Sequence, residues 1–355
     1  MRAAIAEKTR SIPIDTAKVV AIFGTLLIHA SAAGGFAGTP DSFNWISALF
    51  WNCLVRCAVP VFFLCSGALL LPPEKTVTVK TVWTKYIFRI LVALLFWAAA
   101  YSGWSLLLTK LRTGVLELTA LKQALRNLLL FQHKSHLYYL HIILLVYALL
   151  PITRLFAEKA DAKLMRYALA VWFVLSSLLP MLRAFKPLSG LTGIPAQYAI
   201  NLTWGAVGYG LLGYVLSREA GKYRPRVFAL VYLAGFAVTF GGTLVLSLRA
   251  GTLVQTLLQG NSPGVCLQAA GIYGFCVSAF SHKEKWPAAE TISKASFCIY
   301  LVHLFFLDFL NARGIAAGIY PPIWMVPVLV AVMFAAGFGV WLVLRRIPVV
   351  NKYLI

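Results

Sequence analysis

The stretch IDTAKVVAIFGTLLIHAS, residues 14–31, is an apolar segment of helical length that also carries an aspartate, a lysine and a histidine. At about 100° per residue, Asp15, Lys18, Thr25 and His29 fall on one face of a helix. Lys18 and His29 are eleven residues apart in the sequence, which places them roughly 16 Å apart along the helix axis. We therefore predict a helix whose polar face looks into the protein, with a cation near one end and an imidazole near the other.

The ionisable residues of this stretch have two interpretations. Charged and titratable side chains inside a membrane span are costly and commonly mark a working pathway. For Asp15 and Lys18, an interfacial ion pair whose lysine stem reaches to water explains the pattern equally well. His29 lies half way or more across the segment, where an idle polar group would be expensive in hydrocarbon. The sequence therefore favours a functional role for His29 and leaves both interpretations open for Lys18.

The composition is that of a polytopic membrane protein. Of 355 residues, 60% are hydrophobic and only 12% are charged, whereas a soluble domain has about half and about a quarter. The net charge of +21 comes from basic residues in short loops, so anionic lipid headgroups and phosphorylated ligands are the expected counterparts, and nucleic acid is not. The six cysteines lie inside apolar runs, which predicts buried thiols without a disulfide framework or a zinc site.

Ten apolar segments of the chain are long enough to span a membrane, which takes about 20 residues. The predicted fold class is therefore all-α, a polytopic integral membrane protein in which residues 1–355 form a single domain. The predicted spans are approximately 13–33, 44–72, 84–108, 135–153, 167–185, 197–217, 227–248, 263–281, 291–310 and 322–344.

Basic residues are distributed unevenly between the loops. Lys and Arg are concentrated in the N-terminal segment with Arg2, Lys8 and Arg10, in the alternate loops that follow and at the C-terminal end. This bias predicts that both termini face the cytoplasm. The residues then predicted near the cytoplasmic ends of their spans are Lys18, Arg89, Lys294 and Ser66. Those predicted in the outer half are His29, His136, Tyr138, Tyr139, His303 and Asp308, with Arg56 near the middle.

The loop between Lys110 and Lys134 has its own pattern. Leucines recur on one helical face opposite Lys122 and Arg126, which predicts an amphipathic helix lying on the outer leaflet. Elsewhere the chain has no phosphate-binding glycine loop, no dinucleotide fingerprint, no nucleophile elbow and no metal-ligand spacing.

Two spans carry polar residues with open roles. Arg56 is followed by Pro60, which predicts a kink whose freed carbonyls Arg56 could bind. Tying helices together in this way could also be its whole role. In the ninth span Ser296, Tyr300 and His303 share one face, which fits a reaction site or a hydrogen-bonded seam between helices.

Polar and aromatic residues also begin the fourth span. His136, Tyr138 and Tyr139 lie there at the predicted outer interface. An aromatic belt at the membrane surface would place tyrosines at this depth in any case, so the belt is the favoured explanation for the two tyrosines.

Four stretches together resemble the membrane-bound acyltransferase-3 family. They are Lys18 and His29 with ten residues between them after Asp15, VPVFFLCSGALLL at 59–71, HLYYL at 136–140 and SFCIYLVH at 296–303. Their order and spacing are similar to those of the short family members without an extracellular hydrolase-like domain, such as surface-polysaccharide O-acetyltransferases.

The resemblance implies a protein of the bacterial cytoplasmic (inner) membrane with ten or so transmembrane helices. It also implies a cytoplasmic acyl-CoA donor, usually acetyl-CoA, no permanently bound cofactor and no metal. The acceptor would be a hydroxyl on a lipid-linked or surface glycan, and His29 would be the essential residue of the first motif. Many members carry Arg where Lys18 stands, so the planar, bidentate fork of a guanidinium is absent here.

Acyl transfer from acyl-CoA to a sugar hydroxyl is the predicted reaction. A neutral imidazole can take the hydroxyl proton as the oxygen attacks the thioester carbonyl, which makes His29 the candidate general base. Asp15 is too far along the helix to orient this ring, so the orienting group must come from another span, with Tyr300, His303 and Asp308 as candidates.

Other roles follow from the predicted depths. Lys18, Arg89 and Lys294 would hold the phosphates of CoA, and Arg56 or a tyrosine hydroxyl would stabilise the oxyanion. A covalent route through Ser66, a cysteine or a histidine is an alternative. The residues predicted on the acceptor side are His136, Tyr138 and Asp308.

Two functions of other classes compete with acyl transfer. A transporter or flippase would use inward-facing His, Arg and Asp residues as a relay. A ligand-sensing membrane protein would use the same frame only to recognise a small molecule. The residues leave open the acceptor, the acyl chain (acetyl, succinyl or longer) and the oligomeric state.

Overall fold

The computed structural model describes residues 11–74, 76–115, 117–185, 188–190 and 192–355. Within these ranges the protein is built from helices, with no β-strand, which confirms the all-α polytopic fold class. Arg2, Lys8 and Arg10, which entered the prediction of orientation, lie outside the described residues.

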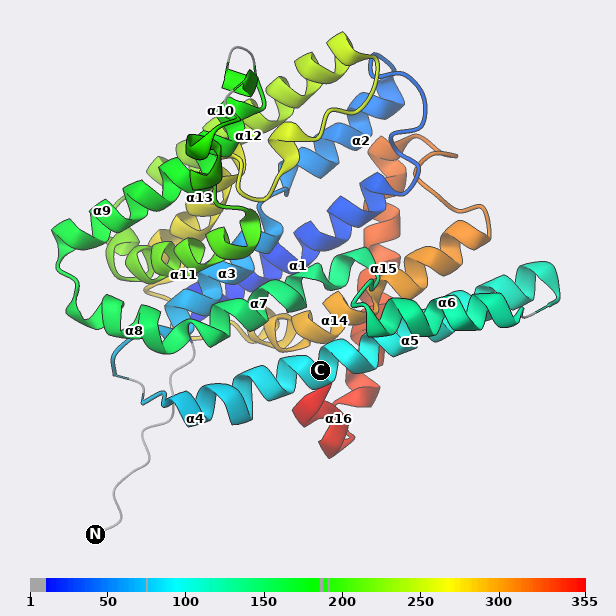
Figure 1. Cartoon of the computed structure of the whole chain (residues 1–355), viewed down its shortest axis with the longest axis horizontal. Coiled ribbons are helices and arrows are strands. Elements are labelled where there is room, and N and C mark those ends of the chain that lie inside the picture. The colour runs from blue at the N-terminus through cyan, green and yellow to red at the C-terminus, as the bar shows by residue number, and fades with distance from the viewer. Residues whose placement is uncertain (1–10, 75, 116, 186–187, 191) are drawn as a thin grey trace.

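The helices follow one another along the chain with short connections (Figure 1). The α-helices are α1 (Ile12–Ala32), α2 (Phe43–Leu54), α3 (Ala58–Leu70), α4 (Val79–Thr81), α5 (Phe88–Thr113), α6 (Leu118–Leu129), α7 (Tyr138–Ala148), α8 (Leu150–Lys159), α9 (Ala162–Phe173), α10 (Leu179–Arg183), α11 (Leu202–Glu219), α12 (Pro225–Ala250), α13 (Pro263–Phe280), α14 (Pro287–Ala312), α15 (Pro322–Leu344) and α16 (Pro348–Tyr353). The 3₁₀ and π-helical segments are η1 (Val82–Ile87), η2 (Ser135–Leu137), η3 (Val174–Leu178), η4 (Leu188–Gly190), η5 (Ile194–Tyr198), η6 (Ala220–Lys222) and η7 (Thr256–Leu258).

The described helices contain eight that are long and apolar enough to cross a membrane, and these coincide with eight of the ten predicted spans. The predicted span 135–153 is instead a pair, Ser135–Ala148 and Leu150–Lys159, bent by 54°. Counted as one broken span, it makes nine. The remaining predicted span, 197–217, forms α11, an 18-residue helix that is not among the eight. The expected count of ten is therefore eight or nine by this measure.

Helix α1 lies at the centre of the bundle, where it packs against α2, α3, α13, α14 and α15 (Figure 1). Its hydroxyl groups are satisfied inside the helix, since Thr16 and Thr25 each donate to the carbonyl four residues earlier, at 2.9 Å. Asp15 is also buried, with 3% of its surface exposed. The prediction that the polar face of this helix looks into the protein is confirmed.

Glycines bring α3 and α11 into backbone contact. A Cβ added to Gly67 would lie 1.8 Å from the carbonyl oxygen of Gly210, and one added to Gly213 would lie 2.1 Å from that of Leu64. Small residues at helix interfaces are the usual means of close packing between membrane helices. This contact fixes the position of α3, which carries Phe62 and Ser66.

The second predicted span is broken rather than kinked. Helix α2 ends at Leu54 and α3 begins at Ala58, so Pro60 lies in the first turn of α3, where its missing N–H costs no helical hydrogen bond. The prediction that Arg56 binds the carbonyls freed at Pro60 is wrong. Side chains of other helices bind the carbonyls near the break: Gln268 donates to Cys53 O at 2.9 Å, and the Tyr232 hydroxyl donates to Leu54 O.

The predicted amphipathic helix is α6, which lies alongside α5 (Figure 1). Leu118, Leu125 and Leu129 are 63%, 57% and 68% exposed. An apolar face left open to this degree fits a helix lying at a membrane surface. The cysteine prediction is also confirmed, since all six are buried and free.

Candidate active site

Three histidines from distant parts of the chain converge between α1, η2 and α14. The ring centroid of His29 lies 5.0 Å from that of His303 and 6.3 Å from that of His136, and the rings of His136 and His303 are 5.4 Å apart. We call these three residues the histidine cluster. His303 and His136 are 0% and 1% exposed, and His29 is partly buried. The structure therefore brings together three of the predicted site residues.

Tyrosines hold the cluster in place. The Tyr300 hydroxyl donates to the carbonyl of His136, which ties α14 to η2. Tyr101 packs its ring 4.8 Å from that of His136 and donates to Leu301 O at 2.7 Å. Sequence reasoning missed Tyr101, whose one available signal was a tyrosine within the long apolar run of the third span. Tyr300 holds the backbone that carries the cluster, and its hydroxyl proton is engaged.

The hydrogen bonds settle the tautomer of His303. Its Nδ1 lies 2.7 Å from the carbonyl oxygen of Tyr300. Because a carbonyl only accepts, Nδ1 carries the hydrogen and Nε2 keeps a lone pair. That Nε2 and both ring nitrogens of His136 are buried with no hydrogen-bond partner among the described residues. Unsatisfied polar atoms in a protein interior are costly and uncommon, so the cluster is a strong candidate for a reaction site.

Arg56 is linked to the helical turn that carries His29. Its Nε donates to Leu258 O at 2.5 Å and its Nη1 to Asn52 Oδ1 at 3.2 Å. The amide nitrogen of Asn52 in turn donates to Ser31 Oγ at 3.0 Å. Asn52 was not predicted, although it precedes Arg56 by one helical turn in the sequence. Arg56 does bind a carbonyl, as one interpretation expected, but that carbonyl comes from η7.

A cavity with a volume of ≈ 300 Å³ is lined by residues of α1, α3, α5, α7 and α14, and we call it the lysine cavity. Its polar lining residues are Lys18, Ser66, Arg89, Tyr139, Tyr147, Ser293, Ser296 and Tyr300. The expected grouping of Lys18, Ser66 and Arg89 is therefore present. Tyr300, which also lines this cavity, contacts the rings of His136 and His303. The cavity therefore connects a pair of cations with the surroundings of the histidine cluster.

Tyr139 and Tyr138 differ in position although they are adjacent in sequence. Tyr139 lines the lysine cavity and packs inside the bundle, 5.2 Å from the ring of Phe63 and 5.5 Å from that of Tyr300. The aromatic belt expected for both tyrosines is therefore wrong for Tyr139. Tyr138 is 43% exposed.

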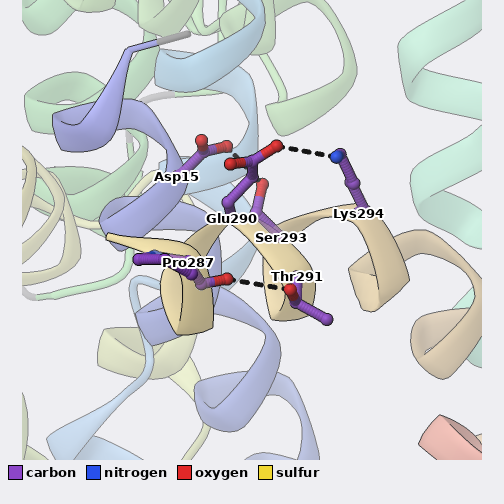
Figure 2. A network of polar contacts seen from close by, with 6 residues as sticks. All are labelled: Asp15, Pro287, Glu290, Thr291, Ser293 and Lys294. Atoms are coloured by element: carbon purple, nitrogen blue, oxygen red, sulfur yellow. Dashed lines mark hydrogen bonds and ion pairs between the residues drawn. The ribbon is translucent and has the colours of Figure 1, made fainter. Parts of the chain in front are cut away.

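A polar network joins α1 to α14 near the start of both helices (Figure 2). Ser293 Oγ donates to Asp15 Oδ1 at 2.6 Å. Lys294 pairs with Glu290 at 2.7 Å on the same helix. Asp15 therefore helps to position the two helices that carry His29 and His303. Lys294 does not line the lysine cavity, in contrast to the expected grouping with Lys18.

A second opening, with a volume of ≈ 650 Å³, is reached by Arg56 and Tyr138, and we call it the amide groove. Its other polar lining residues are Asn201, Thr203, Gln259 and Asn261. An adjoining cavity of ≈ 380 Å³ shares Gln259 and Asn261 with it. None of the described residues that line either opening is Asp or Glu. The groove suits a ligand rich in neutral hydrogen-bonding groups. Its loop residues were missed because they form no pattern in the sequence.

Asp308 is engaged elsewhere. It forms an ion pair with Lys134 at 2.6 Å, with 24% of its side chain exposed. Lys134 directly precedes η2, which carries His136. Within the described part of the chain, no group of three His, Cys, Asp or Glu residues is arranged to hold a metal ion.

The fold and the candidate site define a polytopic membrane protein with a buried cluster of histidines and a cationic cavity that is lined by the neighbouring Tyr300. The family model of acyltransferase-3, described as an acyltransferase domain, matches residues 12–346. The chain therefore belongs to the acyltransferase-3 family and is a membrane acyltransferase. No curated protein and no solved structure matches it.

Proposed function

We propose that this protein transfers an acyl group, acetyl in the first instance, from cytoplasmic acyl-CoA to a hydroxyl of a lipid-linked or cell-surface glycan. The observation that carries the proposal is that two openings of different chemistry are each lined by residues that neighbour the histidine cluster. Tyr139 and Tyr300 line the lysine cavity, whereas Tyr138 and Arg56 line the amide groove. Donor and acceptor would reach the cluster by separate routes.

The lysine cavity has the chemistry that an acyl-CoA donor needs. Lys18 and Arg89 supply positive charge for phosphate groups, and Phe62, Ile90 and Ile143 line a slot for the pantetheine arm. Lys18 and His29 are separated by eleven residues of one helix, or roughly 16 Å. An extended pantetheine arm would carry the thioester over such a distance.

His29 is proposed as the general base. It would take the proton of the acceptor hydroxyl while that oxygen forms a bond to the thioester carbonyl carbon. When the tetrahedral intermediate collapses, the carbon–sulfur bond breaks and the CoA thiolate takes the proton from the His29 imidazolium. The products are an ester and free CoA, and the imidazole is again neutral.

Two residues would support His29. The ring centroids of His303 and His29 are 5.0 Å apart, and Nε2 of His303 keeps a lone pair. By accepting a hydrogen bond from the ring N–H of His29, this nitrogen would fix the tautomer of His29. Arg56 uses one N–H on Leu258 and another on Asn52. Its remaining donors would stabilise the oxyanion of the tetrahedral intermediate. Tyr300 would position His136 and the α14 backbone.

A sugar acceptor fits the amide groove. Its amide and hydroxyl side chains can both donate and accept hydrogen bonds, as the hydroxyls of a glycan require. Tyr138 adds an aromatic surface at the groove.

The test is CoA release from acetyl-CoA by the purified protein in liposomes, with and without an extract of lipid-linked glycans. Glycan-dependent release is expected from the wild type, and the His29→Ala substitution is expected to reduce it by about 10²- to 10⁴-fold. His282→Ala is the matched control, because this histidine is exposed in the connection after α13.

Two results would overturn the proposal. One is a folded His29→Ala protein that transfers acyl groups at the parental rate. The other is a folded wild-type protein that releases no CoA with any acyl donor or acceptor. That result would favour transport or ligand sensing as the function. Thermal unfolding of each variant in the same liposomes checks the fold.

A further inference from the structure

A third opening adjoins the lysine cavity and is lined by cations that the proposed reaction has not used. Its volume is ≈ 400 Å³, and it shares Arg89 and Phe297 with the lysine cavity. Lys294, Arg345 and Arg346 also line it, and none of its described lining residues is Asp or Glu. We call it the arginine cavity. It is formed where the first turns of α5 and the first half of α14 meet the end of α15 and α16.

Two of the three arginines that line this cavity lie over aromatic rings. The guanidinium of Arg345 lies 4.6 Å from the ring centroid of Trp341, and that of Arg89 lies 5.8 Å from the ring centroid of Phe297. A stacked guanidinium keeps its N–H edge free to bind oxygen atoms. Arg89 uses one of its donors on a main-chain oxygen of Ile355. The cavity therefore presents partly ordered donors rather than freely moving side chains.

The fourth cation is shared with an acidic partner. Lys294 pairs with Glu290 at 2.7 Å, and their side chains are 51% and 39% exposed (Figure 2). An exposed ion pair contributes little to stability. The ammonium of Lys294 can therefore turn from Glu290 to a more highly charged anion without a large loss.

The gathering of cations has a plain alternative explanation. Basic residues at the end of a helix interact favourably with its dipole, and Arg345 and Arg346 follow α15 directly. That explanation does not account for Arg89 and Lys294, which come from two other helices. Four cations from three helices around one cavity repel one another, and a multivalent anion relieves this repulsion.

We propose that the arginine cavity binds a phosphate monoester and that, given the proposed function, this is the 3′-phosphate at the nucleotide end of acyl-CoA. Arg345 and Arg346 bind that phosphate, Arg89 and Lys18 bind the pyrophosphate, and the pantetheine arm enters the lysine cavity. The shared wall at Arg89 and Phe297 favours one continuous ligand over a separate lipid headgroup. The cavity thereby selects CoA over donors without the 3′-phosphate.

The test measures binding without turnover. Purified protein in phosphatidylcholine liposomes is titrated with labelled acetyl-CoA, with 3′-dephospho-acetyl-CoA and with adenosine 3′,5′-bisphosphate, and no acceptor is added. The double substitution Arg345→Gln and Arg346→Gln is expected to raise the dissociation constants of acetyl-CoA and of the bisphosphate about tenfold or more, because charge-assisted hydrogen bonds are lost. The dissociation constant of 3′-dephospho-acetyl-CoA is expected to change less than about threefold. Lys352→Gln is the matched control, because Lys352 lies on α16 over the ring of Tyr353 and does not line the cavity.

Three outcomes would overturn the assignment. Equal binding of the bisphosphate by the wild type and the double variant would show that these arginines bind no phosphate. An equal loss for acetyl-CoA and its dephospho form would show that they do not contact the 3′-phosphate. The titrations are repeated in liposomes that contain phosphatidylglycerol, and a bisphosphate affinity of the wild type that falls there, but not in phosphatidylcholine, would identify a lipid headgroup site. If the bisphosphate binds as expected but acyl transfer to glycan is absent, the proposed reaction fails and the phosphate site stands.

Discussion

The lysine cavity and the amide groove share no lining residue among those described, and they are built by different parts of the chain. The polar residues of the lysine cavity lie on long helices at regular spacing, as Ser293, Ser296 and Tyr300 do on α14. Those of the groove lie largely in connections, such as Gln259 and Asn261 between η7 and α13. Lys18 and Arg89 bring two cations to the first, whereas Arg56 lies among neutral amides in the second. In the proposed reaction, donor binding would therefore rest on rigid spans, and acceptor recognition would rest on loops, which vary more readily.

Arg56 is the residue whose change should disturb the groove side most. We expect Arg56→Lys to lower kcat for acyl transfer about a hundredfold, because an ammonium cannot hold Leu258 and Asn52 and also reach the oxyanion. Steady-state kinetics with acetyl-CoA measures this, and the dissociation constant of acetyl-CoA should not change. Arg154→Lys is the control, since Arg154 also donates to main-chain carbonyls but lines neither opening. An unchanged kcat in Arg56→Lys would remove Arg56 from the reaction.

His303 tests whether the cluster works as a unit. We expect His303→Leu to lower kcat about tenfold, because His29 loses the acceptor that fixes its tautomer. His303→Gln should recover part of that loss, since an amide oxygen can accept the same N–H. The kcat values of the two variants are compared after thermal unfolding has shown that the variants are equally stable. Equal activity of the two would mean that His303 contributes packing alone.

Lys18 tests the donor side. We expect Lys18→Met to raise the KM for acetyl-CoA about fivefold through the loss of one charged contact, while the KM for the acceptor stays the same. Lys18→Arg should behave like the parent or bind the donor more tightly, because a guanidinium restores the bidentate fork. A change in the KM for the acceptor with no change in the KM for acetyl-CoA would show that donor and acceptor do not bind by separate routes.

Gln259 tests the acceptor side, with the smallest expected effect. We expect Gln259→Ala to raise the KM for the glycan about threefold, the loss of one hydrogen bond to a neutral group, and to leave the KM for acetyl-CoA unchanged. Gln123→Ala is the control, because Gln123 bonds Asn127 on the exposed helix α6. A donor effect equal to the acceptor effect would show that the groove does not act separately.

Several parts of the site could be predicted from local sequence. The single face of α1 that carries Asp15, Lys18 and His29 follows from the helical period, because each of these residues is costly in lipid and must face the protein. The same reasoning grouped Tyr300 with His303 on α14. It could not name the partner of Asp308, which is Lys134 from a connection far away in the sequence. A period places a residue on a face, but it does not name the partner.

The break between α2 and α3 shows a second limit. Pro60 predicted a distortion of the helix. The position of the break is stabilised by Gln268 and Tyr232, which bind the carbonyls of Cys53 and Leu54. In an apolar environment an opened carbonyl needs a donor, and the donors come from α13 and α12. The sequence analysis missed Tyr101, Asn52 and the amide groove for the same reason. The role of each depends on contacts between segments that are distant in the sequence.

The sequence by itself determined the membrane class, the positions of most spans and the inward face of α1, because composition and helical period act locally. The tertiary structure decided that His29, His136 and His303 meet, that Arg89 joins two cavities and that Arg345 and Arg346 face Lys294. Those meetings depend on how closely helices approach one another. Contacts such as that between Gly67 and Gly210 set this distance, and no single stretch of the chain contains both sides of such a contact.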